Sequence, residues 1–258
     1  MNEKMFVMHH APVDKRKGEI VGSRTDFGLN EYGIEAAHRQ AERIKKMIGT
    51  VALENIDYVI SSPLKRAIQT SEIISKRCKL DIVVDDRLKA QDFGLLDGMT
   101  FDEIYRDDIL KLNLWDYIAP ENRDNHHVPG GAESNNEMVK RVNGFRNDML
   151  SRNSNHMPLI ITHGTVIDSL IALIEKKRLD EVEGENRRYE GRPILFTEYA
   201  YEPIGKSCDI FDFIPGVSEL LLESDPSKII NCVRQYLISQ NVSDSERIHI
   251  EKLLTFYK

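Results

Sequence analysis

The chain has 258 residues and a formal net charge of −7, with 41% hydrophobic and 30% charged residues. This balance is typical of a globular protein with a sizeable core, built as one large domain or one domain with an appendage. The negative charge argues against a general nucleic-acid-binding surface. The three cysteines, Cys78, Cys208 and Cys232, are widely spaced and odd in number, a pattern of neither a disulfide framework nor a cysteine-based metal site.

Two features that the sequence lacks bear on where in the cell the protein is located. Residues 1–10 lack the apolar run of a signal peptide, and no stretch approaches the ~20 apolar residues of a membrane span. We therefore expect a cytoplasmic protein with neither a membrane nor a nucleic acid as its partner.

The first predicted elements are a strand and a long helix. Residues 5–8 form a short apolar run that ends at His9 and His10, which predicts a buried strand delivering two imidazoles to its carboxyl end. A polar, basic loop is expected over residues 14–26. Apolar residues at helical spacing then predict a helix over residues 31–48.

The next elements repeat this strand-then-helix order. Residues 56–60 predict a second strand. Ser62 before Pro63 is a helix start signal, and the helix is expected to begin at the proline and run to about Lys76. Residues 81–84 predict a third short strand.

A further helix and strand lead to a second histidine. A helix is expected over residues 133–151, followed by a strand over residues 158–162 that ends at His163. Gly164 lets another helix begin at once and run to about Lys176. Strands that alternate with helices predict a three-layer α/β/α sandwich around a mostly parallel sheet.

The pattern changes after residue 177. The expected elements are a charged, exposed loop over residues 178–192, strands over residues 193–201 and 208–214, and amphipathic helices over residues 227–239 and 244–257. We interpret residues 1–177 as the core and residues 178–258 as an extension of the same domain that completes the sheet or forms a cap. Such an extension could also serve a homodimer.

Three residues are expected to meet at one edge of the predicted sheet. His9 and His163 follow strands, and Arg66 lies in the first turn after another strand. Ligands of open parallel sheets bind outside the carboxyl ends of the strands. Two imidazoles and a guanidinium at this edge predict a phosphate-binding site.

Five segments of the chain resemble a known family. They are Leu29 to Ala37, Ser61 to Thr70, Asp92-Phe93-Gly94 with Asp97-Gly98, Gly130-Gly131-Ala132-Glu133-Ser134, and Thr162-His163-Gly164-Thr165. In this order they are similar to motifs of the histidine phosphatase superfamily, in its phosphoglycerate mutase-like branch, and they span roughly residues 4–175. The resemblance implies a phosphoglycerate mutase-like fold.

The resemblance also implies roles for three residues. His9 would attack phosphorus and briefly carry the phosphoryl group, which splits the transfer into two easier steps. Arg66 would clamp phosphate oxygens with its planar fork of donors. His163 would hydrogen-bond the phosphoryl group as charge develops on it.

The chain departs from the family pattern at three positions. Met8-His9-His10 stands where the family has Arg-His-Gly, so a second arginine is missing and a histidine replaces a glycine. The position of the family's acidic residue, a general acid, falls on Ala90. The candidates to replace this acid are Asp92 and Glu133.

Other residues are candidates for binding phosphate. His10, if it is protonated by a bound dianion, could supply part of the missing charge, and Arg16 on the following loop could reach the same ligand. Gly164 and Thr165 begin a helix, and backbone N–H groups at a helix start bind anions. His126 and His127 lie beside Asp124, but adjacent loop histidines usually face solvent, so we expect no metal and no cofactor.

Three functions compete on this basis. The first is a metal-independent phosphohydrolase that acts on a small phosphomonoester or a phosphoprotein through phosphohistidine at His9. The second is a catalytically impaired pseudophosphatase that binds a phosphorylated ligand and regulates a partner, as Met8 and Ala90 would suggest. The third is a phosphoglycerate mutase-like phosphotransferase, which the short segment between Gly98 and Gly130 makes weaker.

Overall fold

The computed structural model describes residues 4–48, 56–118, 124–125, 130–152, 157–182, 184, 193–197 and 200–203. The chain divides into two compact units, residues 1–205 and 206–258. The second unit lies outside the described residues, and with it the predicted strand 208–214 and the helices 227–239 and 244–257. None of the described helices combines the length and apolar character that a membrane crossing requires.

Six strands form one sheet in the order β3-β2-β4-β1-β5-β6. The strands are β1 (Met5–His9), β2 (Ile56–Ser61), β3 (Asp81–Val84), β4 (Met157–Thr162), β5 (Ile194–Phe196) and β6 (Tyr201–Pro203). The first four run parallel, whereas β5 pairs antiparallel with both β1 and β6. The mostly parallel sheet is therefore confirmed.

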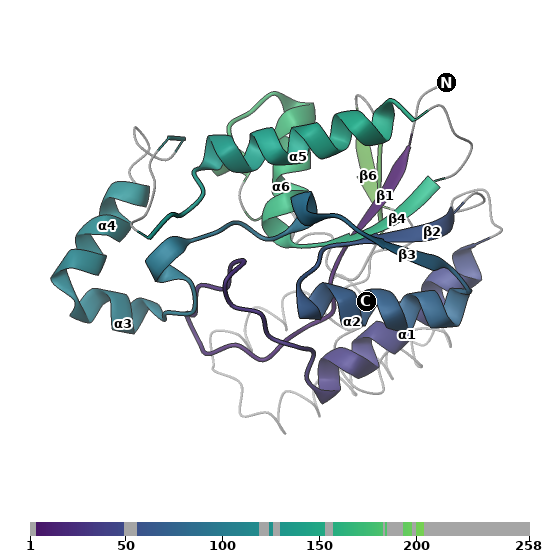
Figure 1. The fold of residues 1–258 in the computed structure, drawn as a ribbon, viewed down its shortest axis with the longest axis horizontal. Helices are drawn as coiled ribbons and strands as arrows, with labels where there is room; N and C mark the ends of the chain where they lie inside the picture. Colours follow the sequence, from purple (N-terminus) through teal and green to yellow (C-terminus); the bar gives the residue numbers. More distant parts are fainter. Residues whose placement is uncertain are drawn as a thin grey trace, which may run out of the picture. The chain divides into compact units, whose positions relative to one another are not determined.

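Helices cover both faces of the sheet (Figure 1). Helices α1 (Glu31–Met47) and α2 (Lys65–Cys78) lie on one side, and α5 (Asn135–Leu150) and α6 (Gly164–Glu175) lie on the other. Each helix packs an apolar stripe onto the sheet, as amphipathic helices of globular proteins do. This confirms the predicted three-layer α/β/α sandwich.

Strand β1 contributes to the cores of both faces because successive side chains of a strand point to opposite sides. Phe6 and Met8 pack in the apolar cluster that contains Ile44 of α1 and Ile74 of α2. Met5 and Val7 belong to the other cluster, with residues of α5 and α6. Burying one such side chain fully stabilises the fold by roughly 1.5–3 kcal/mol.

Two helix starts differ from the sequence prediction. Helix α2 begins at Lys65 and not at Pro63, because Leu64 is still extended at φ −69° and ψ 138°. Helix α5 begins at Asn135 and not at residue 133, because Ser134 caps it and exchanges hydrogen bonds with Glu137 in a capping box. Glu133 therefore lies just before the helix.

Three short helices were not predicted. Helices α3 (Phe101–Arg106) and α4 (Asp108–Ile118) occupy a segment to which the sequence pattern assigned no element. Helix α7 (Leu179–Val182) lies in the segment 178–192 that was expected to be an exposed loop, which was wrong because Leu179 and Val182 are buried. In α7, burial of these two apolar side chains outweighs the charged local sequence.

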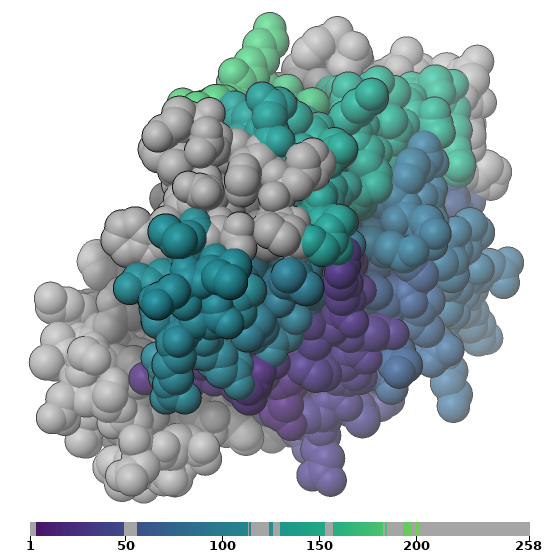
Figure 2. Space-filling model, turned by 60° about the vertical axis from the view of Figure 1, so that its left-hand side comes forward, coloured from purple at the N-terminus to yellow at the C-terminus, as the bar shows by residue number. Residues whose placement is uncertain are grey.

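The loop after β1 packs against α3. The Phe101 amide donates to the carbonyl of Gly18, and the Arg16 guanidinium reaches Glu103. Figure 2 shows the purple N-terminal segment lying beside the teal atoms of α3 and α4. The predicted polar loop 14–26 is thus held by contacts with a segment about 80 residues further along the chain.

Candidate active site

The two predicted site histidines follow neighbouring parallel strands. His9 ends β1 and aligns with Thr162, the last residue of β4, and His163 follows directly. The His10 amide donates to the carbonyl of Thr162 at 3.0 Å, which continues the ladder past the end of β1. His9, His10 and His163 therefore emerge at the same end of the sheet.

Together with Arg66, these residues form what we call the histidine cluster: His9, His10, Arg66 and His163. The His10 ring centroid lies 4.2 Å from that of His9 and 5.1 Å from that of His163. His10 and His163 are buried, and His9 is partly buried. The structure therefore brings together three of the predicted residues and the histidine that replaces the family's glycine.

Backbone carbonyls set the tautomers of the first two histidines. Nδ1 of His9 lies 2.8 Å from the carbonyl oxygen of His10, and Nδ1 of His10 lies 2.7 Å from that of Ala11. A carbonyl can only accept, so each Nδ1 carries a proton. In the neutral ring, Nε2 of each histidine then carries the lone pair, and the lone pair of His10 accepts from Arg66.

Arg66 lies in the first turn of α2 and is 2% exposed. Its Nε donates to Nε2 of His10 at 3.2 Å, and its two terminal nitrogens donate to the carbonyls of Thr25 and Gly22 at 2.8 and 3.0 Å. These bonds use three of the five N–H groups of a guanidinium. Burial lowers the pKa of Arg66, while Asp26 and Asp97 oppose that shift.

Gly22 brings the loop close enough to make one of these bonds. A Cβ atom at this position would lie 2.5 Å from the carbonyl oxygen of Gln91 and 2.5 Å from Oδ2 of Asp97. Asp97 accepts from the Gly22 amide at 2.9 Å. A glycine here is therefore a steric requirement of the contact that holds the loop over Arg66.

His163 is held by Ser62. Its Nε2 lies 2.7 Å from the Ser62 hydroxyl. That hydroxyl accepts from the Leu64 amide at 3.4 Å and can donate its own proton to Nε2, in which case Nδ1 carries the ring proton. Nδ1 of His163 is buried and has no hydrogen-bond partner in the described part of the chain. Burial, followed by the nearby His10 and Arg66, lowers the pKa of His163, so its ring is neutral near pH 7.

Position 8 does not supply a cation. The Met8 side chain is completely buried in the apolar cluster beneath α1 and α2. His9 points to the opposite face because the strand alternates. The charge that the family resemblance places next to the nucleophile is therefore absent from this position.

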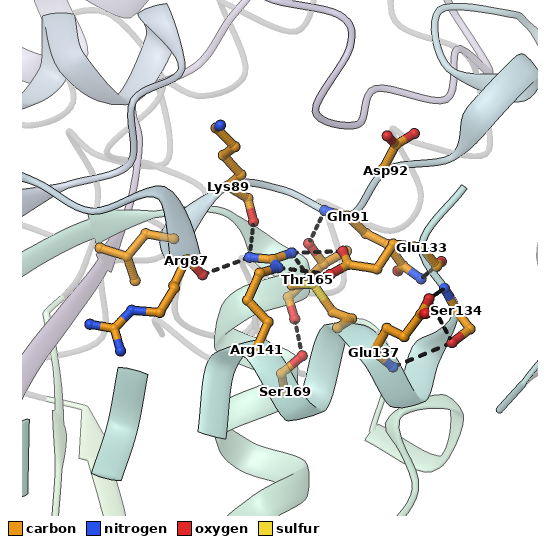
Figure 3. A network of polar contacts seen from close by, with 12 residues as sticks. Arg87, Lys89, Gln91, Asp92, Glu133, Ser134, Glu137, Arg141, Thr165 and Ser169 are labelled. Carbon is orange, nitrogen blue, oxygen red and sulfur yellow. Dashed lines mark hydrogen bonds and ion pairs between the residues drawn. The ribbon is translucent and has the colours of Figure 1, made fainter. Parts of the chain in front are cut away.

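The segment that carries Ala90 runs beside His163. The Thr162 hydroxyl donates to the carbonyl of Leu88 at 2.8 Å, and the Gln91 amide donates to the Thr165 hydroxyl at 3.2 Å. The second of these contacts is visible in Figure 3. Position 90 thus lies between two anchors that flank His163, and its side chain is a buried methyl group.

A network around Arg141 holds the same segment, and we call it the Arg141 network. Arg141 donates to the carbonyls of Arg87 and Lys89 at 2.6 and 3.1 Å and to both carboxylate oxygens of Glu133 at 2.7 Å (Figure 3). Gln91 donates from its side-chain amide to the carbonyl of Glu133 at 3.2 Å. The Glu133 carboxylate is therefore bridged to a guanidinium on both oxygens.

Asp92, the other candidate acid, is also paired. One carboxylate oxygen accepts from Nε of Arg24 at 2.7 Å and from the Gly94 amide at 2.8 Å. Figure 3 shows the Asp92 side chain pointing away from Glu133 and Arg141. Neither candidate acid has a hydrogen bond to the histidine cluster among the described contacts.

The remaining candidates divide into two groups. Arg16 binds Glu19, Glu103 and the carbonyl of Gly98, so the structure gives its donors to the loop and not to the cluster. Gly164 and Thr165 open α6, where the first N–H groups have no partner within the helix. In the described ranges, no group of three or more histidines, cysteines or acidic residues could hold a metal, and His126 and His127 lie outside them.

Sequence reasoning missed three residues that shape the site: Ser62, Gln91 and Arg141. Ser62 before Pro63 has the pattern of a helix start signal, yet in the structure it contacts His163, 101 residues further along the chain. Arg141 lies eight residues after Glu133, so the two flank the start of α5 and can pair around it. Because Glu133 lies outside the helix, this pair has neither of the i,i+3 and i,i+4 spacings by which a sequence indicates an ion pair.

Comparisons with known proteins agree with this fold. Residues 5–189 match the family model of the histidine phosphatase superfamily (branch 1). The chain is 24% identical over 221 residues to the probable phosphoglycerate mutase GpmB of Proteus mirabilis, across 81% of this chain and 95% of that protein.

The solved structures that are similar to it include the following two. Bacillus stearothermophilus YhfR has a TM-score of 0.62 and 22% identity, over 79% of this chain and 96% of YhfR. The mycobacterial glucosyl-3-phosphoglycerate phosphatase in complex with inorganic phosphate has a TM-score of 0.60 and 19% identity, over 80% of this chain and 97% of that one. The family match runs from β1 past α7 and contains the whole histidine cluster, and the chain therefore belongs to branch 1 of the histidine phosphatase superfamily.

Proposed function

We propose that this chain hydrolyses phosphate monoesters of small molecules through a phosphohistidine on His9. The observation that carries the proposal is the contact of 2.8 Å between Nδ1 of His9 and the carbonyl of His10. It leaves Nε2 as the nucleophilic nitrogen of a neutral imidazole. Nε2 would form the bond to phosphorus as the ester P–O bond breaks, and water would then cleave the P–N bond to release phosphate.

Neighbouring groups would stabilise the phosphoryl group during transfer. Arg66 has two N–H groups beyond those in its three hydrogen bonds. Nδ1 of His163 is buried without a described partner and could bind a phosphoryl oxygen. The amides of Gly164 and Thr165 add donors at the positive end of α6. Loose phosphoryl transfer needs mainly such positioning and charge.

The relatives support a small phosphorylated substrate. One similar structure is a glucosyl-3-phosphoglycerate phosphatase bound to inorganic phosphate, and one relative is a probable phosphoglycerate mutase. Both names refer to phosphorylated small molecules. We carry over this chemical class and no particular substrate, since identity to either protein is below 25%.

The weak point of the proposed reaction is protonation of the leaving group. Ala90 has no acidic proton, and the carboxylates of Asp92 and Glu133 are paired with Arg24 and Arg141. A general acid contributes roughly 10²–10⁴ in rate when the leaving group is basic. We therefore expect turnover of aryl phosphates, whose leaving groups need no proton, and much slower turnover of alkyl phosphates.

The proposal is tested by assaying phosphate release from p-nitrophenyl phosphate, glycerol phosphate and 3-phosphoglycerate with a chelator present. Natural protein should cleave the aryl ester fastest and should form an acid-labile phosphoprotein. His9→Gln, which keeps a side chain of similar size, should lose both signals, whereas His38→Gln on the exposed face of α1 should keep them. No release from any ester between about pH 5 and pH 8 would contradict the proposal.

The pairing of both candidate acids also favours a second function, a pseudophosphatase that binds a phosphorylated ligand without turnover. It predicts that inorganic phosphate binds and that no phosphohistidine forms. A phosphohistidine that disappears in His9→Gln would eliminate this candidate. Conversion of 3-phosphoglycerate into its isomer, instead of phosphate release, would indicate the mutase-like phosphotransferase.

A further inference from the structure

His10 stands where the family resemblance expects a glycine, in the middle of the histidine cluster. Its ring centroid is 4.2 Å from that of His9 and 5.1 Å from that of His163. Its Nε2 accepts from Nε of Arg66 at 3.2 Å. The His10 side chain therefore contacts every other member of the histidine cluster.

The contact with Arg66 defines the resting state of His10. Nδ1 donates to Ala11, so Nε2 can accept from Arg66 only while the ring is neutral. Met8 brings no second guanidinium because it is buried in the apolar core. A phosphate dianion at the cluster would thus meet one arginine, where the family pattern provides two.

We propose that His10 takes up a proton when a phosphate group binds, and that it then donates from Nε2 to the phosphate oxygens as the second cation of the site. The inference rests on the phosphate site of the proposed function. The proton comes from solvent. Once protonated, Nε2 can no longer accept from Arg66, so the Arg66 Nε–H is freed and both groups can donate to the anion.

The electrostatics of the site favour this coupling. Without a ligand, the pKa of His10 is lowered well below 6.5 by burial and then by His9 and Arg66, so the ring is neutral at pH 7. Among the described residues, the charged or titratable groups that act on His10 and His163 are His9, Lys15, Arg66 and Arg141, with Asp26 and Asp97 acting on Arg66. A bound dianion adds two negative charges and favours the protonated ring.

The buried Nδ1 of His163 is an independent sign of a ligand. A buried polar atom left without a hydrogen bond destabilises the fold, and this atom has no partner among the described residues. It belongs to the ring next to His10. An oxygen of a bound anion would satisfy it and would lie within reach of both rings.

Proton uptake makes a specific prediction about affinity. Sulfate remains a dianion across the neutral range, so any pH dependence of its binding comes from the protein. If one proton is bound together with sulfate, the dissociation constant rises by up to about tenfold per pH unit as the pH increases. Inorganic phosphate should show the same linkage once its own titration is subtracted.

The test is calorimetric titration of the full chain with sulfate between about pH 5.5 and pH 8, in two buffers that differ in ionisation heat. Wild-type protein and the exposed control His38→Gln should take up close to one proton per sulfate. His10→Gln keeps an acceptor for Arg66 but cannot be protonated, so it should take up almost none. The affinity of His10→Gln for sulfate should be nearly independent of pH, and at acidic pH it should therefore be lower than that of the wild-type protein.

A second measurement uses wild-type protein and so does not depend on whether the His10→Gln variant folds. In wild-type protein with ¹⁵N-labelled histidine, the Nε2 signal of His10 should change from unprotonated to protonated when sulfate is added. Unchanged proton uptake in His10→Gln, or an unprotonated Nε2 in the complex, overturns the inference. Tighter binding in His10→Gly also overturns it, since His10 would then only obstruct the site.

Failure of this inference can be distinguished from failure of the proposed function. Proton-linked sulfate binding without any phosphohistidine leaves the role of His10 intact and rejects catalysis. Phosphohistidine formation with sulfate binding that releases or takes up no proton rejects the role of His10 and leaves catalysis intact. Absence of sulfate and phosphate binding rejects both.

Discussion

The histidine cluster and the Arg141 network are neighbours, linked through Thr162 and Thr165, yet they use their polar groups differently. In the cluster, a buried nitrogen of His163 has no described partner, and Arg66 donates to a neutral imidazole. In the network, Arg141 satisfies one carboxylate and two carbonyls. The histidine cluster thus keeps hydrogen-bonding groups for a ligand, whereas the Arg141 network uses its hydrogen-bonding groups to hold segments of the chain together.

This difference explains why family membership does not by itself establish catalysis in this chain. The groups that would bind and attack a phosphoryl group are gathered at the ends of β1 and β4. The groups that could protonate a leaving group are tied into ion pairs with Arg24 and Arg141. We therefore expect substitutions in the Arg141 network to change mainly stability and substitutions in the histidine cluster to change mainly the chemistry.

The largest effect is expected for Met8→Arg, which restores the family residue in the wrong surroundings. The side chain at position 8 is fully buried among apolar residues, and an unpaired buried charge costs roughly 3–5 kcal/mol. Urea unfolding should show that loss, while Met8→Leu should cost less than about 1.5 kcal/mol. Normal stability together with faster hydrolysis would mean that position 8 can reach the cluster.

Arg141→Ala should come next. It leaves Glu133 and the carbonyls of Arg87 and Lys89 without their donor in a half-buried site, which we expect to cost about 2–4 kcal/mol. Urea unfolding measures the loss. The exposed Arg152, which contacts the Tyr58 hydroxyl, is a matched control, and Arg152→Ala should change stability by less than about 0.5 kcal/mol. Equal losses in both variants would contradict a structural role for the network.

Ala90→Glu tests whether a missing general acid limits hydrolysis. Position 90 lies between the anchors at Leu88 and Gln91, next to His163. A carboxylic acid there should raise the hydrolysis of alkyl phosphates by about 10–100-fold, a part of what a general acid can supply. Ala90→Gln has the same size but no acidic proton, and it should not gain activity. Equal rates in the two variants would show that the acid is not what the site lacks.

The pH dependence of stability separates the two regions most finely. The pKa values of His10 and His163 are lowered in the folded state, mainly by burial. The unfolded chain therefore binds more protons below about pH 6.5, and stability is lost as the pH falls, by up to about 1.4 kcal/mol per pH unit for each histidine. His163→Gln should reduce this slope in urea unfolding, and Arg141→Ala should change it far less, because Arg141 is the smallest of the listed causes of the lowered pKa of His163. An unchanged slope in His163→Gln would contradict a buried, neutral ring.

Much of the fold could be predicted because its signals are local. The apolar run before His9, the helical spacing over residues 31–48 and the strand before His163 each determine their element from neighbouring residues. Helices α3 and α4 could not be predicted in this way. Helix α4 exposes Ile109 and Leu112 as well as burying Leu114, so its apolar residues form no clean stripe.

The sequence by itself determined the family, the layered sheet, and the meeting of His9, Arg66 and His163, because strand ends of a parallel sheet lie at one edge. Only the tertiary structure decided what these groups can still do. It buried Met8 away from the cluster, paired Glu133 with Arg141, and placed the His10 ring against Arg66. Such pairings depend on contacts between segments from 8 to 56 residues apart, and no local pattern specifies which donor will reach which acceptor.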